Sequence, residues 1–267
     1  TLFPNAGIVT LNPFYPPIIK SISAYFKEIT FVSSLQTEDK LLKEIESVIV
    51  LNDSKILFLN NFIGVEGRIY SKKFWMTIME LVEKLNLFLI IDEGLSFDKL
   101  QYPESINNEK TIRVVSLSKK YGIPGMKIGF MVGGRKFMDE FYDYASTNYG
   151  GPLSVFFLLS EFLYIFEHAY ITDGKKSTIL KELGTRYNIS YSLLTDLYTN
   201  FSETLKKNKE NFNCNLYIFK DWIENNMQHF DAVYLFGGIN TFIRLKPKFG
   251  TANYFFHHSI SKFGVSV

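Results

Sequence analysis

The chain contains very little cysteine, with Cys214 as the single example in 267 residues. One cysteine cannot form an internal disulfide, and a metal cluster built on cysteines within the chain is excluded. This composition is typical of proteins from a reducing compartment, so we expect a cytoplasmic location. The four histidines do not show the spacing of a metal site, and we therefore expect no metal centre.

Long apolar runs and an excess of one charge are also missing. The most apolar stretch, residues 154–166, is interrupted by Glu161 and is too short to span a bilayer. No signal peptide is visible. Lys and Arg number 29 and Asp and Glu 27, which gives a net charge of +2. This balance does not indicate a nucleic-acid or membrane surface, so we expect neither partner. Because the chain begins with Thr1 rather than Met, we interpret it as a piece of a longer polypeptide.

Apolar residues are abundant, at 46% of the chain, which supports a substantial core and argues against global disorder. In the first half, short apolar runs alternate with amphipathic stretches. The pattern predicts strands at 7–11, 29–32, 55–60, 87–92, 112–117 and 127–132, and helices at 15–26, 38–48 and 72–84. Such alternation predicts an α/β fold with a mainly parallel central sheet and flanking helices.

The second half of the chain has a different character. It predicts helices at 136–144, 153–169, 175–210 and 254–263, and strands at 232–234, 240–245 and 264–267. We interpret this part as a smaller α+β lobe joined to the first by long helices. The expected division is a large domain over 1–168 and a small C-terminal domain over 169–267, both of them partial.

The most informative stretch is SLSKKYGIPGMKIGF, which spans residues 116–130. Two hydroxyl residues precede Lys119, glycines follow it, and Lys127 adds a second cation eight positions later. Upstream, the strand-like LFLII at 87–91 leads directly into Asp92 and Glu93. Ligands of parallel sheets gather at the carboxyl ends of strands, where both Asp92 and Lys119 are predicted to lie. A lysine beside hydroxyl and cationic groups, with a carboxylate at a nearby strand end, indicates covalent chemistry with an aldehyde cofactor.

In their order and spacing these motifs resemble those of the class I/II aminotransferases, which are fold-type I enzymes dependent on pyridoxal 5′-phosphate (PLP). The resemblance runs from about Asn12 to Val267, and its most specific part is the motif around Lys119. It implies a PLP cofactor, amino-acid and keto-acid substrates, and a homodimer with active sites at the subunit interface. It also implies that 1–168 corresponds to the PLP-binding large domain.

The resemblance assigns roles to three residues at predicted strand ends. Lys119 is the expected Schiff-base lysine and the proton carrier. The alternative is a solvated lysine after a strand, without a role in function. Asp92 is expected to bond the pyridine nitrogen and keep it protonated; alternatively it caps a turn. Asn61, in NNFIG at 60–64, is expected to donate to the cofactor's phenolic oxygen, although a turn asparagine is a common alternative.

Four further residues are expected to bind the cofactor. Tyr15, in NPFYP at 12–16, is expected to stack on the pyridine ring. Core packing is the alternative for this residue, because the chain has 16 Tyr and 26 Phe. Ser116, Ser118 and Lys127 are expected to hold the phosphate through two hydroxyls and a cation. For the serines, ordinary strand-end hydroxyls are the alternative.

The chain also departs from the family pattern. Lys127 stands where the family has arginine, which keeps the charge and loses the bidentate fork. Leu95 replaces a tyrosine donor, and Phe62 and Ile63 replace a Pro-Thr pair. The family's phosphate loop would lie before Thr1, and its substrate-binding arginine beyond Gly264-Val265. We interpret Arg244 as structural and not as that arginine.

The resulting hypothesis is a PLP-dependent aminotransferase that acts on an amino acid through a Schiff base of Lys119. Two alternatives remain open from the sequence. The domain is a degenerate, non-catalytic aminotransferase-like module used for binding or scaffolding, or it catalyses another PLP reaction on the same fold, such as elimination, decarboxylation or cyclisation.

Overall fold

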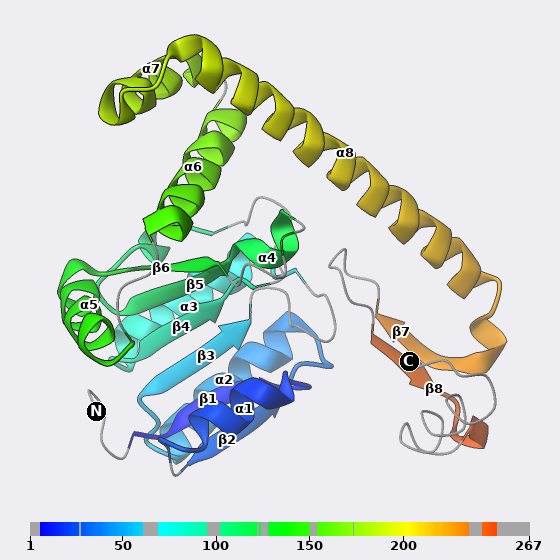
Figure 1. The fold of residues 1–267 in the computed structure, drawn as a ribbon. Coiled ribbons are helices and arrows are strands. Elements are labelled where there is room, and N and C mark those ends of the chain that lie inside the picture. The colour runs from blue at the N-terminus through cyan, green and yellow to red at the C-terminus, as the bar shows by residue number, and fades with distance from the viewer. Residues whose placement is uncertain are drawn as a thin grey trace.

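The structure is a computed structural model that describes residues 6–26, 28–60, 69–94, 102–121, 123, 128–149, 154–172, 174–234 and 242–249. Its first half is built around a six-stranded sheet in the order β2-β1-β3-β4-β5-β6 (Figure 1). The strands are β1 (Ile8–Asn12), β2 (Ile29–Ser33), β3 (Ile56–Asn60), β4 (Phe88–Asp92), β5 (Thr111–Ser116) and β6 (Gly129–Gly133). The first five strands are parallel, and β6 runs antiparallel to β5. The mainly parallel sheet predicted from the sequence is confirmed.

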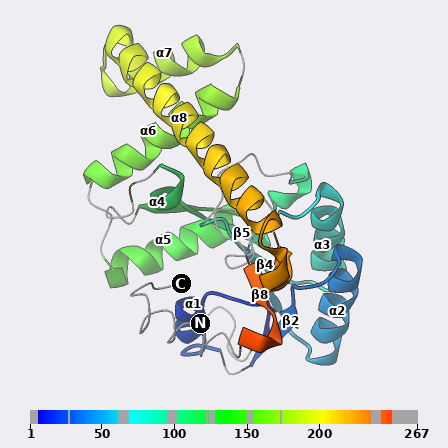
Figure 2. The ribbon, with the colours of Figure 1, turned by 90° about the vertical axis from the view of Figure 1, so that its right-hand side faces the viewer.

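Helices cover both faces of this sheet, as Figures 1 and 2 show. One face carries α1 (Pro16–Ile22) and α5 (Arg135–Tyr149), and the other carries α2 (Glu38–Leu51) and α3 (Lys72–Lys84). The start of α3 is fixed by Ser71, whose hydroxyl accepts a hydrogen bond from the Phe74 amide at 3.1 Å. That bond satisfies one of the free N–H groups of the first turn. Helix α1 is shorter than predicted, because the chain leaves the helix in a turn after Ile22.

The larger core lies between the sheet and the α2–α3 layer. Helix α2 contributes Leu41, Ile45 and Ile49, and α3 contributes Phe74, Trp75 and Ile78. A smaller core on the other face joins β1 and β3 to α1. Burial of each such aliphatic or aromatic side chain is worth about 1.5–3 kcal/mol, so these two layers fix the sheet and the ends of its strands.

In the second half of the chain, one helix rises from the sheet, a second lies beyond it, and a third, long helix runs back towards β7 (Figure 1). They are α6 (Ser154–Ile171), α7 (Lys176–Tyr187) and α8 (Tyr191–Glu224), and they share a core of their own, which we call the helix cluster. Its buried residues are Phe166, Ala169, Leu180, Leu183, Leu194 and Tyr198. The expected domain boundary after residue 168 falls inside α6.

The helical region predicted at roughly 175–210 is confirmed, but it consists of two helices and extends further than predicted. Asn188 takes a left-handed conformation with φ of 53°, which ends α7, and the Ser190 hydroxyl caps the start of α8 by accepting from the Leu193 amide. Asparagine tolerates this conformation better than most residues, so the break has a local cause. Helix α8 then continues to Glu224, because the charged run near residue 210 is readily solvated on a helix surface.

The chain ends, within the described part, in a small antiparallel pair of strands, β7 (Phe230–Tyr234) and β8 (Phe242–Leu245). Arg244 on β8 forms an ion pair with Asp231 on β7, with 2.6 Å between Nε and Oδ2. Short 3-10 turns occupy Glu104–Ile106, Met227–His229 and Pro247–Phe249. The helix predicted at 254–263 and the strand at 264–267 lie outside the described residues.

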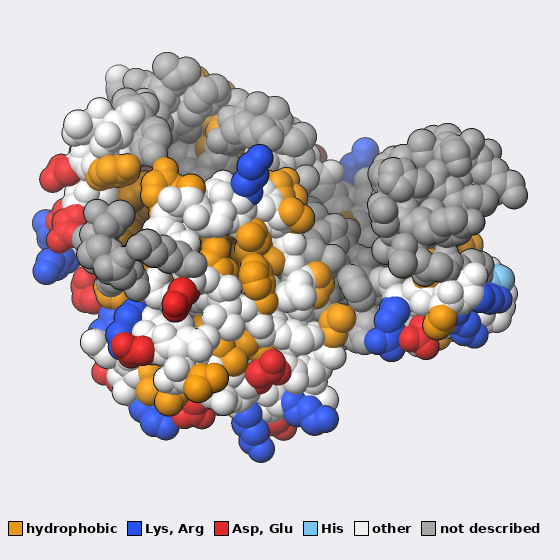
Figure 3. Space-filling model, turned by 90° about the horizontal axis from the view of Figure 1, so that it is seen from below, with side chains coloured by type: hydrophobic (Ala, Val, Ile, Leu, Met, Phe, Trp, Pro, Cys, Tyr) orange, Lys and Arg blue, Asp and Glu red, His pale blue; other side chains and the backbone are white. Residues whose placement is uncertain are grey.

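The surface of the described residues carries both signs of charge. Figure 3 shows basic and acidic side chains interspersed on the face seen from below, with apolar side chains between them. None of the described helices is both long and apolar enough to cross a membrane. Cys214 lies exposed on α8 as a free thiol.

Candidate functional site

Polar side chains meet where the central parallel strands end. In the strand register, Asn60 at the end of β3 lies opposite Asp92 at the end of β4. The next strand, β5, ends at Ser116, and the one-turn helix α4 (Leu117–Lys120) follows it directly. Neighbouring parallel strands bring their carboxyl ends to one edge of the sheet, which is where ligands bind in such folds. The structure therefore brings Asp92, Ser116 and the backbone of Lys119 to a common edge, as predicted.

Asp92 is held by two donors. Its Oδ1 accepts from the Gly94 amide at 2.7 Å, and its Oδ2 accepts from the Asn60 amide nitrogen at 3.0 Å. Burial raises the pKa of Asp92 above the ordinary value of 3.8, and the charge of Glu93 raises it further, while the two hydrogen bonds oppose that rise. Each carboxylate oxygen has more than one acceptor position, so Asp92 keeps the capacity to bind one more donor.

Asn60 is a site residue that the sequence analysis missed. It is only 4% exposed, and its side-chain oxygen has no hydrogen-bond partner among the described atoms. The predicted residue was the neighbouring Asn61, which lies outside the described residues. A polar residue at the end of an otherwise continuous apolar strand is the signal that points to Asn60.

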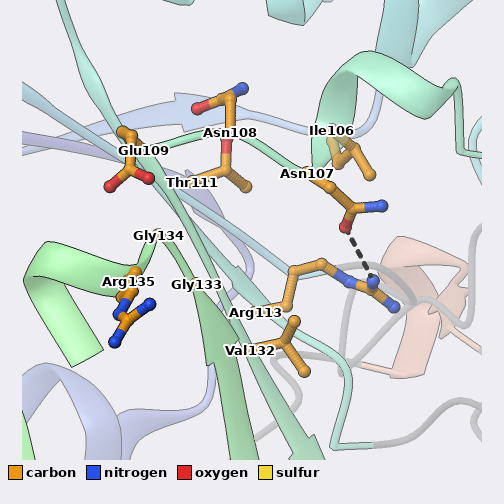
Figure 4. Close-up of a pocket in the computed structure, with 10 residues that line it drawn as sticks. All are labelled: Ile106, Asn107, Asn108, Glu109, Thr111, Arg113, Val132, Gly133, Gly134 and Arg135. Carbon is orange, nitrogen blue, oxygen red and sulfur yellow. Dashed lines mark hydrogen bonds between the residues drawn. The ribbon is translucent and has the colours of Figure 1, made fainter. Parts of the chain in front are cut away.

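Glu93, the residue that follows Asp92, forms a largely buried ion pair with Arg113. Glu93 is 4% exposed, and Arg113 on β5 binds it in bidentate fashion, with Nε–Oε1 of 2.5 Å and Nη2–Oε2 of 3.2 Å. The guanidinium also lies 4.9 Å from the ring centroid of Tyr102 and bonds Asn107 at 3.5 Å (Figure 4). Glu93 raises the pKa of Asp92, so we infer that Arg113 limits this effect by compensating the charge of Glu93.

Arg113 also lines a cavity of about 220 Å³ (Figure 4). The cavity lies beside Thr111 at the amino end of β5 and beside Gly133 at the carboxyl end of the antiparallel β6. This is the opposite end of the parallel strands from Asp92 and Ser116. Because ligands of parallel sheets bind at the carboxyl ends of the strands, we do not assign the cavity to the candidate site.

The helical turn that carries Lys119 is fixed at its start. The Ser116 hydroxyl accepts from the Ser118 amide at 3.4 Å, and the Leu117 amide donates to the Ile128 carbonyl at 3.1 Å. A side chain at Gly129 would lie 2.6 Å from the Val115 carbonyl oxygen, so β5 and β6 can approach this closely only with glycine there. The side chain of Lys119 and all of Lys127 lie outside the description.

Tyr15 follows β1 and directly precedes α1. Its side chain is 56% exposed, whereas the neighbouring Phe14 is buried and packs edge-on against Phe58 with ring centroids 5.3 Å apart. Tyr15 therefore does not belong to the core, and its proposed stacking on a ligand stays a prediction.

Among the described residues, His, Cys, Asp and Glu side chains form no group of three or more that could hold a metal ion. The residues gathered at the strand ends instead offer a half-buried carboxylate, two hydroxyls and a lysine-bearing turn. A lysine on this turn, beside a carboxylate and hydroxyl groups, is the set of residue types that covalent chemistry by an amine on a bound aldehyde requires.

Comparison with known proteins identifies the family. The model of the family "aminotransferase class I and II" matches residues 1–162. The chain belongs to this family. The matched region includes Asp92, Ser116 and Lys119, so the candidate site lies wholly within it.

Individual relatives agree with this membership. The chain is 28% identical over 153 residues to the LL-diaminopimelate aminotransferase of Natranaerobius thermophilus, with 54% of this chain and 39% of that protein covered. It is 26% identical over 144 residues to the enzyme of the same name from Gloeobacter violaceus, with 50% and 36% covered. The chain thus spans less than half of the length of these relatives.

A solved structure extends the likeness to the helices after residue 162. A PLP-dependent aminotransferase from Streptococcus suis superimposes with a TM-score of 0.69 and 18% identity, covering 98% of this chain and 62% of that one. At this identity the likeness shows the fold, and it confirms the expected architecture of a PLP-transferase for the described elements.

Proposed function

We propose that this chain is part of a PLP-dependent aminotransferase that acts on an amino acid through Lys119. The observation that carries the proposal is the position of Asp92. In a member of the aminotransferase class I and II family, this half-buried carboxylate ends β4 beside the strand that leads into the Lys119 turn. The domain boundary near residue 168 and the roles of the site residues are parts of the same proposal.

The described residues fit the cofactor. Asp92 has both oxygens oriented by donors and retains acceptor capacity for a pyridinium N–H. A side chain in place of Gly94 would lie 2.9 Å from Asp92 Oδ1 and 3.9 Å from the Ser116 Cβ. Glycine at position 94 therefore lets the backbone approach Asp92 closely, so that the Gly94 amide donates to the carboxylate without a steric clash.

The side chains divide the chemistry among them. Bound PLP supplies an electron sink for the electrons released at the substrate's α-carbon. Asp92 would keep the pyridine nitrogen protonated, because a carboxylate stabilises an adjacent N–H⁺ group. The Lys119 amine would hold the cofactor by condensing with its aldehyde, with release of water, and would carry the substrate's α-proton after a substrate amine has displaced it. Ser116, Ser118 and Lys127 would neutralise and orient the phosphate.

Two contacts of the cofactor and the class of substrate remain predictions from the resemblance. Tyr15 would stack on the pyridine ring, and its exposure leaves the ring accessible for this contact. Asn61 would donate to the phenolic oxygen. The substrate would be an amino acid, with a keto acid as product or acceptor. LL-diaminopimelate belongs in the donor screen because two relatives are named for it.

The decisive experiment compares Lys119→Ala with Lys120→Ala, since the second lysine is a neighbour in the same turn. With added PLP, we expect a visible absorbance band in the wild type and in Lys120→Ala, and its loss in Lys119→Ala. The band should respond to amino donors, and keto-acid formation should be lost only in Lys119→Ala. A band that persists in Lys119→Ala refutes the assigned lysine.

Other results of the same assay identify the alternative functions. Absence of the band in all three folded proteins supports a non-catalytic, aminotransferase-like binding domain. A band that responds to amino acids with release of CO₂ or of a side-chain fragment, and without transfer of the amino group, supports a decarboxylase or a lyase.

We also propose a homodimer in the cytoplasm. Large apolar side chains stand exposed on the helices after β6, among them Tyr142, Val155 and Phe157 at 57–68% exposure, which suits a covered surface. The free thiol of Cys214 suits a reducing compartment. Sedimentation that gives an active monomer contradicts the dimer, and cell fractionation tests the location.

A further inference from the structure

The turn that carries Lys119 is closed at its end by Tyr121. The Tyr121 amide donates to the Leu117 carbonyl at 3.1 Å, and the Ile123 amide donates to the Ser118 carbonyl at 2.9 Å. These two hydrogen bonds span Lys119 on both sides. The position of the lysine's backbone therefore depends on where Tyr121 is held.

The side chain of Tyr121 reaches from the sheet domain to the helix cluster. Its hydroxyl donates to the carboxylate of Glu167 on α6, and its ring centroid lies 5.6 Å from that of Phe201 on α8. Phe201 is itself 5.6 Å from Phe166, which is buried in the helix cluster. Tyr121 thus joins the lysine's turn to two helices that come much later in the chain.

The hydrogen bond to Glu167 keeps Tyr121 as the donor and Glu167 as the acceptor. Burial, and after it the charge and the hydrogen bond of Glu167, raise the pKa of Tyr121 far above its ordinary value. The hydroxyl therefore stays protonated and remains a donor throughout the working pH range. A hydroxyl that donates to a carboxylate is a charge-assisted bond and is stronger than a neutral one.

We propose that Tyr121 is a positioning residue for Lys119, which fixes the lysine's helical turn to the helix cluster through Glu167 and Phe201. The effect on the reaction rests on the proposed function, because it assumes that Lys119 is the cofactor-binding lysine. The effect on the turn itself concerns the protein without cofactor and is independent of that assumption.

The chain supplies a matched control. Tyr187 on α7 donates to the carboxylate of Glu161 on α6, and its ring lies 5.5 Å from that of Phe162. The donor and acceptor groups are of the same kind, although Glu161 is also bound by Arg186 at 2.6 Å, and this bond joins α6 to α7 and not to the lysine's turn. Tyr187→Phe therefore reports what the loss of a Tyr–Glu hydrogen bond does to the cluster alone.

The first measurement is hydrogen exchange of the Tyr121 and Ile123 amides in the full chain without PLP. We expect exchange to be about tenfold faster in Tyr121→Phe, as for the loss of one hydrogen bond to a charged group. In Tyr187→Phe the two amides should exchange as in the wild type. Equal exchange in the two variants overturns the proposal.

The second measurement is the rate at which PLP is trapped on Lys119 by borohydride, followed by peptide mass spectrometry. We expect trapping to be about tenfold slower in Tyr121→Phe, because a small displacement of a reacting amine has this kind of effect. Glu167→Gln keeps an acceptor but loses its charge, so its trapping rate should lie between those of the wild type and Tyr121→Phe. Glu167→Leu should reproduce Tyr121→Phe, and it replaces that variant if circular dichroism shows Tyr121→Phe to be unfolded.

The two measurements separate the two proposals. If the wild type itself gives no adduct on Lys119, the proposed function fails, while hydrogen exchange still decides the role of Tyr121. If trapping on Lys119 is normal and equally fast in Tyr121→Phe and Tyr187→Phe, the proposed function stands and the positioning role is wrong.

Discussion

Replacing Arg113 should lower the free energy of unfolding by more than the loss of an exposed ion pair would. Its partner Glu93 is 4% exposed, so Arg113→Met leaves a carboxylate buried without a compensating charge. Breaking such a pair costs about 3–5 kcal/mol. Because Arg113 is itself 22% exposed, water can enter the space that its side chain leaves and partly solvate Glu93. We therefore expect a loss of unfolding free energy near the lower end of this range, at about 3 kcal/mol. With a urea m-value of about 3 kcal/mol/M, the unfolding midpoint should fall by about 1 M.

Two further variants test the reasoning behind this number. Arg113→Met combined with Glu93→Leu removes both charges, so its stability should return to within about 1–2 kcal/mol of the wild type. Lys84→Met breaks the exposed pair between Lys84 and Glu46, whose atoms are 2.8 Å apart, and should lose at most about 1 kcal/mol. Urea unfolding at neutral pH measures all three. A double variant no more stable than Arg113→Met would refute the idea that an uncompensated charge causes the loss.

Three further predictions follow from the site and the core. Since burial raises the pKa of Asp92 in the folded protein, its ionisation opposes folding above pH 3.8, so apo Asp92→Asn should be more stable than the wild type near pH 7. That advantage should disappear as the pH falls through the raised pKa towards 3.8. Urea unfolding across this pH range measures the stability difference between the two proteins, and a difference that does not change with pH contradicts the reasoning. Asn60→Leu removes a donor to Asp92 and should weaken PLP binding about tenfold, measured by titration of the visible band; unchanged affinity contradicts this role. Ile45→Ala in the core should cost about 2–5 kcal/mol, whereas the exposed Val50→Ala on the same helix should cost less than about 0.5 kcal/mol in the same unfolding assay.

The sequence was sufficient for the sheet because its signals are local. Continuous apolar strands alternate with amphipathic helices, and each of the five parallel strands ends at a polar residue, such as Asp92 or Ser116. Parallel pairing then places those ends at one edge without any knowledge of the strand order. For this reason the strand-end positions of Asp92 and Lys119 could be predicted from the sequence alone.

Contacts between strands and between lobes could not be predicted in this way. The bond of Asn60 to Asp92 requires β3 and β4 to be neighbours, and the pairing of Arg113 with Glu93 requires the register of β4 and β5. The break at Asn188 depends on one residue in a left-handed conformation, which leaves little trace in a helical periodicity. Long-range pairing and single backbone conformations are the information that a local pattern lacks.

Because α8 is long, a small rotation at its first turn produces a large displacement at its last turn. Its 34 residues extend about 51 Å at 1.5 Å per residue, from the helix cluster to the segment that leads into β7. A tilt of about 5° at the first turn would therefore displace the last turn by about 4 Å. The chain's single cysteine lies about 35 Å along this helix and is exposed, so a spectroscopic label on Cys214 would amplify any such rotation. If the distance from this label to the sheet stays constant when a ligand binds, α8 does not rotate.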